Sequence, residues 1–184
     1  SSAASDVYKR QVLECARANG NLVYQRKGIA RYHLTVKGRS AHAGVDYENG
    51  RNAIEELAHW IIALQGATDL SKETTVNVGL VEGGTVINAV PGLAKAAVDV
   101  RYYDKTEITR IEELMEELKA HPHVPDTQVK IEGGITRPPM LPSEKTGQLM
   151  KLIETQGKRV GVTFGWTVSG GGSDGSFSAD AGAV

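Results

Sequence analysis

Hydrophobic residues recur along the chain with two different periods, and segments of one period alternate with segments of the other. Apolar residues at every second position predict strands over 29–37, 74–81, 93–103 and 127–131. Apolar residues at helical spacing predict one helix over 50–64 and another between Asp104 and His121. The elements therefore follow one another as strand, helix, strand, strand, helix, strand.

This order is typical of a ferredoxin-like βαββαβ sandwich, in which two helices cover one face of a four-stranded antiparallel sheet. Asp104 and Thr106 can cap the second helix, and His121-Pro122 ends it. Every element contains apolar residues that we expect to face the core. In the helices and the second strand they are Ile54, Leu57, Ala58, Ile61, Ile62, Leu64, Val76, Val78, Leu80, Ile108, Ile111, Leu114, Met115 and Leu118.

The segment after this domain has a pattern of its own. It predicts a helix over Glu144 to Lys158 and a strand over Val160 to Val168. A glycine-rich loop, Ser169 to Gly175, follows that strand, and the residues up to Val184 read as the start of another strand. These elements are too few to form a domain alone.

We therefore expect a compact domain at 29–140, inserted between two parts of a second domain at 12–28 and 141–184. Residues 1–11 resemble a translated sequencing adapter, and we exclude them from the fold. Neither end of the sequence has the character of a natural domain boundary. The chain is thus predicted to be an internal fragment.

Composition and charge argue against several classes of function. Of the 184 residues, 40% are hydrophobic and 23% are charged, and the formal net charge is −1, so no basic surface indicates nucleic acid or an anionic membrane as partner. No apolar run is long enough to span a bilayer, and no signal peptide is recognisable. The single cysteine, Cys15, can form no internal disulfide. The default expectation is a cytoplasmic protein without nucleic-acid or membrane partners.

One histidine lies in a loop of small residues, Gly38-Arg39-Ser40-Ala41-His42-Ala43-Gly44, directly after the first predicted strand of the inserted domain. Small neighbours allow a ligand to approach the imidazole closely, and histidine is the side chain that changes charge near neutral pH. The alternative for His42 is a solvated loop residue. The other histidines lack such surroundings and are expected to be structural or exposed: His33, His59, His121 and His123.

Six segments occur in a single order through nearly the whole chain. They are Val12-Leu13-Glu14-Cys15-Ala16-Arg17, Arg26-Lys27-Gly28, the His42 loop, Gly83-Gly84-Thr85-Val86-Ile87-Asn88-Ala89-Val90-Pro91, Asp99-Val100-Arg101 and Gly171-Gly172-Ser173-Asp174-Gly175. Together they resemble the zinc metallopeptidase family of glutamate carboxypeptidase, aminoacylase and succinyl-diaminopimelate desuccinylase, most of all the glutamate carboxypeptidase branch. The resemblance implies the α/β fold class: a ferredoxin-like α+β dimerisation domain inserted in an incomplete catalytic domain that binds two zinc ions.

The resemblance assigns one zinc ligand to this chain, Glu14, whose carboxylate supplies a charged oxygen. The alternative for Glu14 is an exposed residue at a strand end. Cys15 stands where the family usually has proline; neighbours in a strand point to opposite faces, so we interpret Cys15 as a small buried residue. The family's other zinc ligands and its general base belong before Val12 and after Val184. We therefore expect the chain alone to be inactive.

The resemblance also implies a catalytic role for His42, which would reach from one subunit into the active site of the other and stabilise an oxyanion there. Asn88 and Arg101 match a pair of substrate-binding positions, with an amide that can donate and a planar fork that can hold a carboxylate. The alternative for Asn88 is a turn before Val-Pro. For Arg101 it is an ion pair with Asp99 or Glu82.

Backbone N–H groups of the glycine-rich loop can bind an anion, but no Gly-Lys-Ser/Thr completes a nucleotide-binding loop. The resemblance implies instead that Gly171, Gly172 and Ser173 line the substrate pocket and bind the terminal carboxylate. Arg137 leads back toward the catalytic domain and is expected to face the same carboxylate. Its alternative is an ordinary linker arginine.

We thus expect a fragment of a zinc-dependent amidohydrolase or exopeptidase that cleaves a small peptide or N-acyl amino acid next to a free carboxylate. An aminoacylase or dipeptidase of the same family is the nearest alternative. From a different class, the chain is a non-catalytic dimerisation or binding module. A helix face and an edge strand of the inserted domain predict a homodimer.

Overall fold

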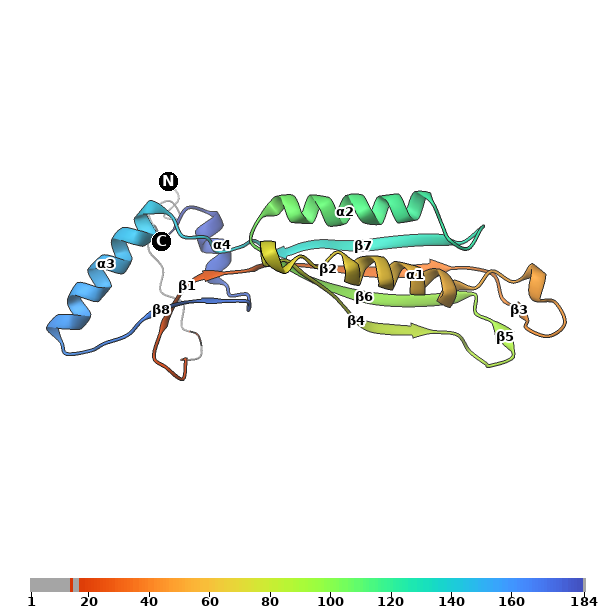
Figure 1. The fold of residues 1–184 in the computed structure, drawn as a ribbon, viewed down its shortest axis with the longest axis horizontal. Helices are drawn as coiled ribbons and strands as arrows, with labels where there is room; N and C mark the ends of the chain where they lie inside the picture. Colours follow the sequence, from red (N-terminus) through yellow and green to blue (C-terminus); the bar gives the residue numbers. More distant parts are fainter. Residues whose placement is uncertain (1–13, 15–16, 184) are drawn as a thin grey trace, which may run out of the picture. The chain divides into compact units, whose positions relative to one another are not determined.

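The computed structural model describes residue 14 and residues 17–183, and it divides the chain into two compact units (Figure 1). We call Ala30–Thr136 the central unit, and the residues up to Ile29 together with those from Arg137 onward the flanking unit. No helix in these described residues is long and apolar enough to cross a membrane. Residues 1–11 and Cys15, for which the sequence made predictions, lie outside the described residues.

The main elements of the central unit follow the predicted order. They are β2 (Gly28–Lys37), α1 (Ala53–Gly66), β4 (Thr75–Gly83), β6 (Leu93–Tyr102), α2 (Lys105–Ala120) and β7 (Gln128–Arg137). The four strands form one sheet in the order β4, β6, β2, β7, and β4 pairs with β6 in antiparallel orientation. This connectivity confirms the predicted βαββαβ arrangement.

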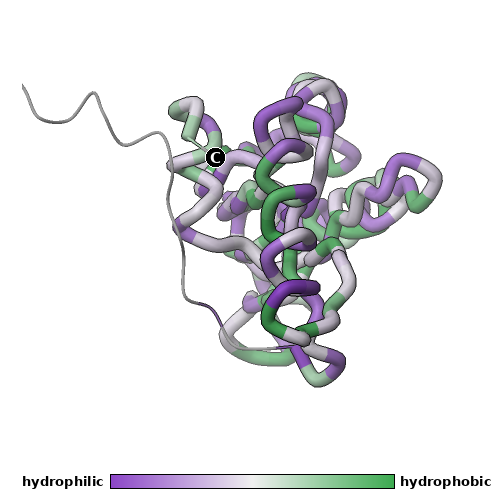
Figure 2. The backbone as a smooth tube through the Cα atoms, turned by 90° about the vertical axis from the view of Figure 1, so that its left-hand side faces the viewer, coloured by the Kyte–Doolittle hydropathy of each residue, from purple (hydrophilic) through white to green (hydrophobic). Residues whose placement is uncertain are grey.

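Polar caps fix where the two helices of the central unit begin. The Asn52 side chain accepts hydrogen bonds from the backbone N–H groups of Ile54 and Glu55, so α1 begins later than the hydrophobic pattern alone suggests. Asp104 caps α2 through the N–H of Thr106, as predicted, and His121 ends the helix. Figure 2 shows how hydrophobic and hydrophilic residues alternate along the backbone.

The core lies between the sheet and both helices. Every second residue of β2 and β6 is buried there, and the helices contribute their inner faces. The largest fully buried apolar side chains are Trp60, Tyr102, Leu34, Leu57, Leu64, Ile111 and Met115. Because residues from α1 and α2 join one cluster with residues from all four strands, both helices cover the same face of the sheet.

Some predicted core positions are exposed. On α1, Ile54, Ala58 and Ile62 lie on the outer side, and Ile62 is 72% exposed. On β4, Leu80 is 71% exposed because the strand register shifts between Val78 and Leu80. A one-residue shift sends the following side chains to the opposite face. The prediction that these residues belong to the core is therefore wrong.

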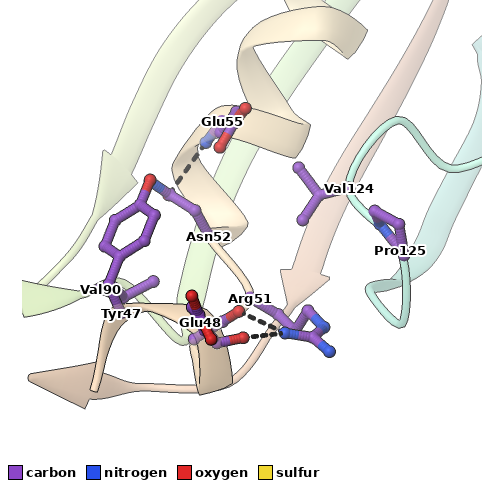
Figure 3. A pocket seen from close by; sticks show the side chains of 9 residues that line it. Tyr47, Glu48, Arg51, Asn52, Glu55, Val90, Val124 and Pro125 are labelled. Carbon is purple, nitrogen blue, oxygen red and sulfur yellow. Dashed lines mark hydrogen bonds between the residues drawn. The ribbon is translucent and has the colours of Figure 1, made fainter. Parts of the chain in front are cut away.

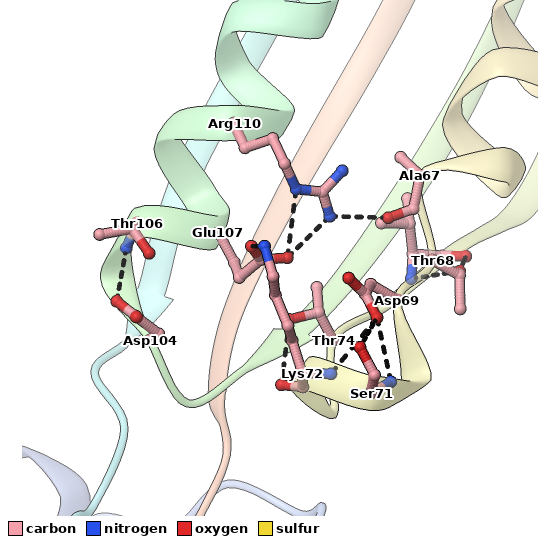
Figure 4. A network of polar contacts seen from close by, with 11 residues as sticks. Ala67, Thr68, Asp69, Ser71, Lys72, Thr74, Asp104, Thr106, Glu107 and Arg110 are labelled. Carbon is pink, nitrogen blue, oxygen red and sulfur yellow. Dashed lines mark hydrogen bonds and ion pairs between the residues drawn. The ribbon is translucent and has the colours of Figure 1, made fainter.

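Glu107 anchors α2 to the chain that connects α1 with β4 (Figure 4). Its carboxylate is only 3% exposed, and it accepts hydrogen bonds from Lys72 Nζ at 2.7 Å and Arg110 Nη2 at 2.7 Å. Arg110 also donates to the carbonyl of Ala67 at 2.8 Å. These bonds from two cations lower the pKa of Glu107 from its ordinary 4.5 to about 2.

The flanking unit contains two strands and two helices. They are β1 (Leu22–Arg26), α3 (Glu144–Arg159), β8 (Trp166–Ser169) and α4 (Gly175–Asp180). The strands β1 and β8 pair in parallel, and the helix α3 begins at a capping box made by Ser143 and Thr146.

Two predictions for this unit need correction. The strand expected to begin at Val160 begins only at Trp166, because the carbonyls at the end of α3 bond the N–H groups of Val160 and Val162 and hold that segment in a turn. The strand start expected at the carboxyl end is also wrong. Residues after the glycine loop form α4, in which the N–H of Ser176 bonds the carbonyl of Ser173.

Candidate functional site

Two predicted site residues lie side by side in loops of the central unit. The short strands β3 (Ala41–His42) and β5 (Ala89–Val90) pair in antiparallel orientation, with His42 opposite Ala89. The backbone N–H of Ala43 donates to the carbonyl of Asn88 at 2.9 Å. We call this group of loops, residues 38–52 and 84–92, the loop cluster. Its first segment leads from β2 to α1, and its second leads from β4 to β6.

Glycines allow the loop cluster to pack closely. The N–H of Gly38 donates to the carbonyl of Gly92 at 2.9 Å. A Cβ atom on Gly38 would collide with the carbonyl oxygen of Arg51, and one on Gly92 would lie 2.7 Å from Oγ of Ser40. Gly38 and Gly92 therefore let two backbone segments approach each other. That the small residues of the 38–44 loop let a ligand approach His42 stays a prediction.

The imidazole of His42 is held in one tautomer. Its Nδ1 accepts a hydrogen bond from the N–H of Gly44 at 3.2 Å, so this nitrogen carries no proton and the proton lies on Nε2. The side chain is exposed. His42 therefore presents Nε2–H, a hydrogen-bond donor, to whatever approaches the loop cluster.

Asn88 lies in a turn, in which the N–H of Ala89 donates to the carbonyl of Val86. The turn-forming alternative for Asn88 thus describes its backbone. Its side chain is exposed and makes no hydrogen bond to any residue in the described part of the chain. Next to it, Ile87 is fully exposed and Val86 largely so. Asn88 can use both its amide donors and its carbonyl on a ligand.

Arg101 lies far from the other two residues. It occupies the end of β6, whereas Asn88 comes before the start of that strand at Leu93. Arg101 lies eight positions beyond Leu93 along the extended strand, a distance of about 26 Å. Asn88 and Arg101, both substrate-binding positions according to the resemblance, therefore lie apart within one chain. The strand predicted over 93–103 already implied this separation.

Asp99 holds the guanidinium of Arg101 on the open face of the sheet. Arg101 donates through Nε at 2.6 Å and through Nη2 at 3.0 Å to the two carboxylate oxygens of Asp99. Arg31, on the adjacent strand β2, donates through Nε to the same carboxylate at 3.4 Å. Of the two ion-pair partners weighed for Arg101, the structure contains Asp99, since Glu82 pairs with Lys95.

Two open cavities border the loop cluster. One, of about 400 Å³, lies between the start of α1 and the loop that contains Val124 and Pro125 (Figure 3). In it, Arg51 donates to the backbone carbonyls of Glu48 and Gly50 and pairs with Asp126. The other, of about 500 Å³, is lined mainly by small and apolar residues between Gly83 and Pro91. Neither brings together the charged groups of a catalytic site.

The predicted carboxylate-binding residues of the flanking unit do come together. Arg137 Nη1 donates to Asp174 at 2.7 Å, and its guanidinium lies over the ring of Phe177, 5.7 Å from the centroid. A Cβ atom on Gly172 would lie 2.9 Å from Cδ of Arg137. Ser173 is buried, and its Oγ accepts the N–H of Gly175. The loop and Arg137 thus form one packed structure.

A zinc site does not form from the residues described here. Across residue 14 and residues 17–183, no three His, Cys, Asp or Glu side chains lie close enough to hold a metal ion. Glu14 is exposed and belongs to no strand. A single carboxylate does not satisfy the tetrahedral coordination that zinc prefers. The part of the chain described here therefore does not fit a zinc pair.

Comparison with known proteins places this fold in a family. Residues 24–127, more than half of the chain, match the family described as peptidase dimerisation domain. The chain belongs to this peptidase dimerisation domain family. The match covers β2, α1, β4, β6 and α2, together with the loop cluster that contains His42 and Asn88.

Relatives of this peptidase dimerisation domain include carboxypeptidases. Carboxypeptidase G2 of Pseudomonas sp. is 28% identical over 153 residues, which are 83% of this chain and 37% of that protein. A probable carboxypeptidase of Ajellomyces dermatitidis is 36% identical over 97 residues, which are 46% of this chain and 22% of that protein. The chain thus spans less than two fifths of the length of these relatives.

Solved structures share the fold. The aminopeptidase PepT from Bacillus cereus has a TM-score of 0.77 and 25% identity, and the alignment covers 92% of this chain and 45% of that one. A tripeptidase from Staphylococcus aureus has a TM-score of 0.78 and 22% identity, with the same shares covered. This peptidase dimerisation domain therefore shares its fold with an aminopeptidase and a tripeptidase of known structure.

Proposed function

We propose that this chain is the dimer-forming and substrate-binding part of a metal-dependent peptidase or amidohydrolase that cleaves an amide next to a free carboxylate. Membership of the peptidase dimerisation domain family supports the class of protein. The carboxypeptidase relatives support the free carboxylate. A zinc pair belongs to this proposal for the longer protein only, since the residues described here do not hold one.

The separation of His42 and Asn88 from Arg101 is the observation that carries the proposal. The two groups lie at opposite ends of β6, about 26 Å apart along the strand. A small peptide or N-acyl amino acid cannot bridge that distance within one chain. A second copy can supply the missing group, so that each active site contains Arg101 of one chain and His42 with Asn88 of its partner.

Within such a site, His42 and Asn88 act as donors. The Nε2–H of His42 donates to the carbonyl oxygen of the scissile amide, which becomes negative when the carbonyl carbon is attacked. The side-chain amide of Asn88 holds a neighbouring carbonyl or carboxylate of the substrate. Arg101, held by Asp99, adds positive charge to the site, which favours an anionic substrate over a neutral one.

The edge strand β4 supports the proposed dimer. Both β4 and β7 are edges of the sheet. Leu80 and Val81 of β4 are exposed apolar residues, whereas Lys130 and Glu132 of β7 are charged. Charged edges resist pairing with another chain and apolar ones favour it. We therefore place the dimer contact at β4 and at the neighbouring apolar stripe of α1, which contains Ile54 and Ile62.

Complementation between two inactive variants tests the proposal in the full-length gene product. The His42→Ala and Arg101→Ala proteins are prepared separately, then mixed, dissociated and reassociated. If His42 acts in the partner's site, half of the sites in each mixed dimer contain neither substitution, and about a quarter of the wild-type turnover returns on mixing.

The same experiment distinguishes the opposite arrangement. If His42 and Arg101 of one chain serve the same site, every site in the mixed dimer carries a substitution and no activity returns. A mixture of the His42→Ala and Asn88→Ala proteins is the matched control, because both groups come from the same chain in our proposal. That mixture is expected to stay inactive, and recovery of activity in it would contradict the proposal.

A further inference from the structure

Arg26 is a buried arginine to which the sequence analysis gave no role. It ends β1 in the flanking unit, and its backbone N–H and carbonyl both bond to Met140. The residue is only 7% exposed. Its guanidinium donates through Nη1 to the carbonyl of Gly171 at 3.1 Å, which is its single side-chain hydrogen bond to the described residues.

This environment does not balance the charge of Arg26. A guanidinium is always protonated and has five N–H donors, and here one of them reaches a neutral carbonyl. Buried charges in proteins are usually paired, because removing a charge from water costs several kcal/mol. No carboxylate in the described part of the chain forms an ion pair with Arg26, whereas nearby Arg137 pairs with Asp174.

A second buried polar group without a hydrogen-bond partner lies next to the loop that Arg26 contacts. Ser176 follows the loop at the start of α4 and is fully buried, and its hydroxyl makes no hydrogen bond within the described residues. Arg26 contacts Gly171, and Arg137 packs against Gly172, where the missing Cβ leaves room also for Ile29. Two guanidinium groups therefore adjoin consecutive residues of one loop.

We propose that Arg26 binds a carboxylate anion at the glycine-rich loop, with its planar fork contacting the two carboxylate oxygens. This inference rests on the proposed function, and the anion is the free carboxylate of the substrate or product. On the sequence alone, Arg137 is the expected cationic partner. Because Asp174 already occupies Arg137, the structure assigns this role to Arg26.

Titration of the 184-residue chain with N-acetylglycine, followed by amide chemical shifts in NMR spectra, tests the proposal. N-acetylglycinamide is the probe control, since it has the same shape without the charge. Saturable shifts at residues 170–175 are expected with the acid and none with the amide. Binding of both compounds with equal affinity would overturn the proposal.

Three variants define the role of Arg26. In Arg26→Gln, the amide can still donate to the Gly171 carbonyl but the charge is lost, so we expect affinity for N-acetylglycine to fall about tenfold or more. Arg26→Lys keeps the charge without the fork and is expected to bind with intermediate affinity. Arg159→Gln removes an exposed cation elsewhere in the flanking unit and is expected to bind like the wild type.

Wild-type affinity in Arg26→Gln would show that Arg26 only supports the loop, and would overturn the proposal. If the spectrum of Arg26→Gln shows an unfolded flanking unit, Arg26→Lys decides, and an affinity equal to wild type would contradict use of the fork. A failure of this inference can be distinguished from a failure of the proposed function. Complementation through His42 in the full-length protein can succeed even if Arg26→Gln binds N-acetylglycine like the wild type. It can also fail even if Arg26→Gln loses affinity for N-acetylglycine.

Discussion

At the scale of single residues, the backbone beside His42 determines which ring nitrogen carries the proton. The N–H of Gly44 occupies Nδ1, and this leaves Nε2–H as the outward donor. Arg101 and Arg137 show the same principle with side chains: an aspartate of the chain itself holds each guanidinium in place. Residue types in the sequence identify such groups as donors, but their hydrogen-bond partners determine which atoms remain available.

Replacement of His42 by alanine tests this assignment at the residue scale. In the full-length protein, loss of one oxyanion donor is expected to lower kcat about a hundredfold or more. The KM should change little, since the bond forms mainly in the transition state. Steady-state kinetics measure both values. His121→Ala, which removes an exposed histidine at the end of α2, is the matched control and should keep wild-type kcat; an unchanged kcat in His42→Ala would return His42 to the solvated-loop interpretation.

At the scale of elements, caps and buried polar anchors decide where helices begin and how they are held. The helix α2 begins at Asp104, as the sequence predicted, because an aspartate before an apolar periodic segment is a strong capping signal. Its anchoring by Glu107 could not be predicted. In the sequence, Glu107 is an ordinary polar residue of the first helical turn. It becomes the buried partner of an ion pair only because Lys72, from the connection between α1 and β4, lies next to it.

The Glu107 anchor predicts a specific dependence of stability on pH. The pKa of Glu107 is about 2 in the folded chain against an ordinary 4.5, so the ionised carboxylate stabilises the fold at pH values above 4.5. This contribution is lost as the pH falls from 4.5 toward 2. Urea unfolding at pH 7, 5 and 3 is expected to show the loss in the wild type.

The Glu107→Gln variant provides the comparison. At pH 7 its free energy of unfolding is expected to be lower by about 3 kcal/mol, because two cations lose a buried partner. Between pH 5 and 3 it should lose less stability than the wild type. Glu132→Gln, which breaks an exposed pair with Lys130, is the control and should have a much smaller effect. Equal pH dependence of wild type and Glu107→Gln would exclude the anchor as the cause.

At the scale of the whole molecule, a single chain does not bring all of its candidate substrate-binding residues together. His42 and Asn88 meet in the loop cluster, whereas Arg101 lies at the far end of β6. The exposed apolar residues of β4 and α1 provide a surface on which a second chain can bind. In the function that we propose, association of two chains brings both groups of residues into one site.

Light scattering of the 184-residue chain at micromolar concentration tests this association. We expect a mass twice the 19.7 kDa of one chain. The Leu80→Asp variant places a charge in the proposed interface and is expected to be monomeric, with an unchanged circular dichroism spectrum. Ile135→Asp makes the same change on β7, the opposite edge, and should remain dimeric. A monomeric wild type, or dissociation by Ile135→Asp alone, would argue against β4 as the contact.

The sequence by itself determined the order of the elements in the central unit, the helix caps and the residue types that resemble a peptidase family. These depend on local periodicity and on contacts between near neighbours, which the sequence records directly. Only the tertiary structure decided the rest. The register shift in β4 exposes Leu80, and a helix, α4, forms where a strand was expected. Arg101 lies far from Asn88, and the charged side chain of Arg26 is buried. Each of these features depends on contacts between segments that are far apart in the sequence and on the exclusion of water from those contacts. A local sequence pattern does not specify such contacts.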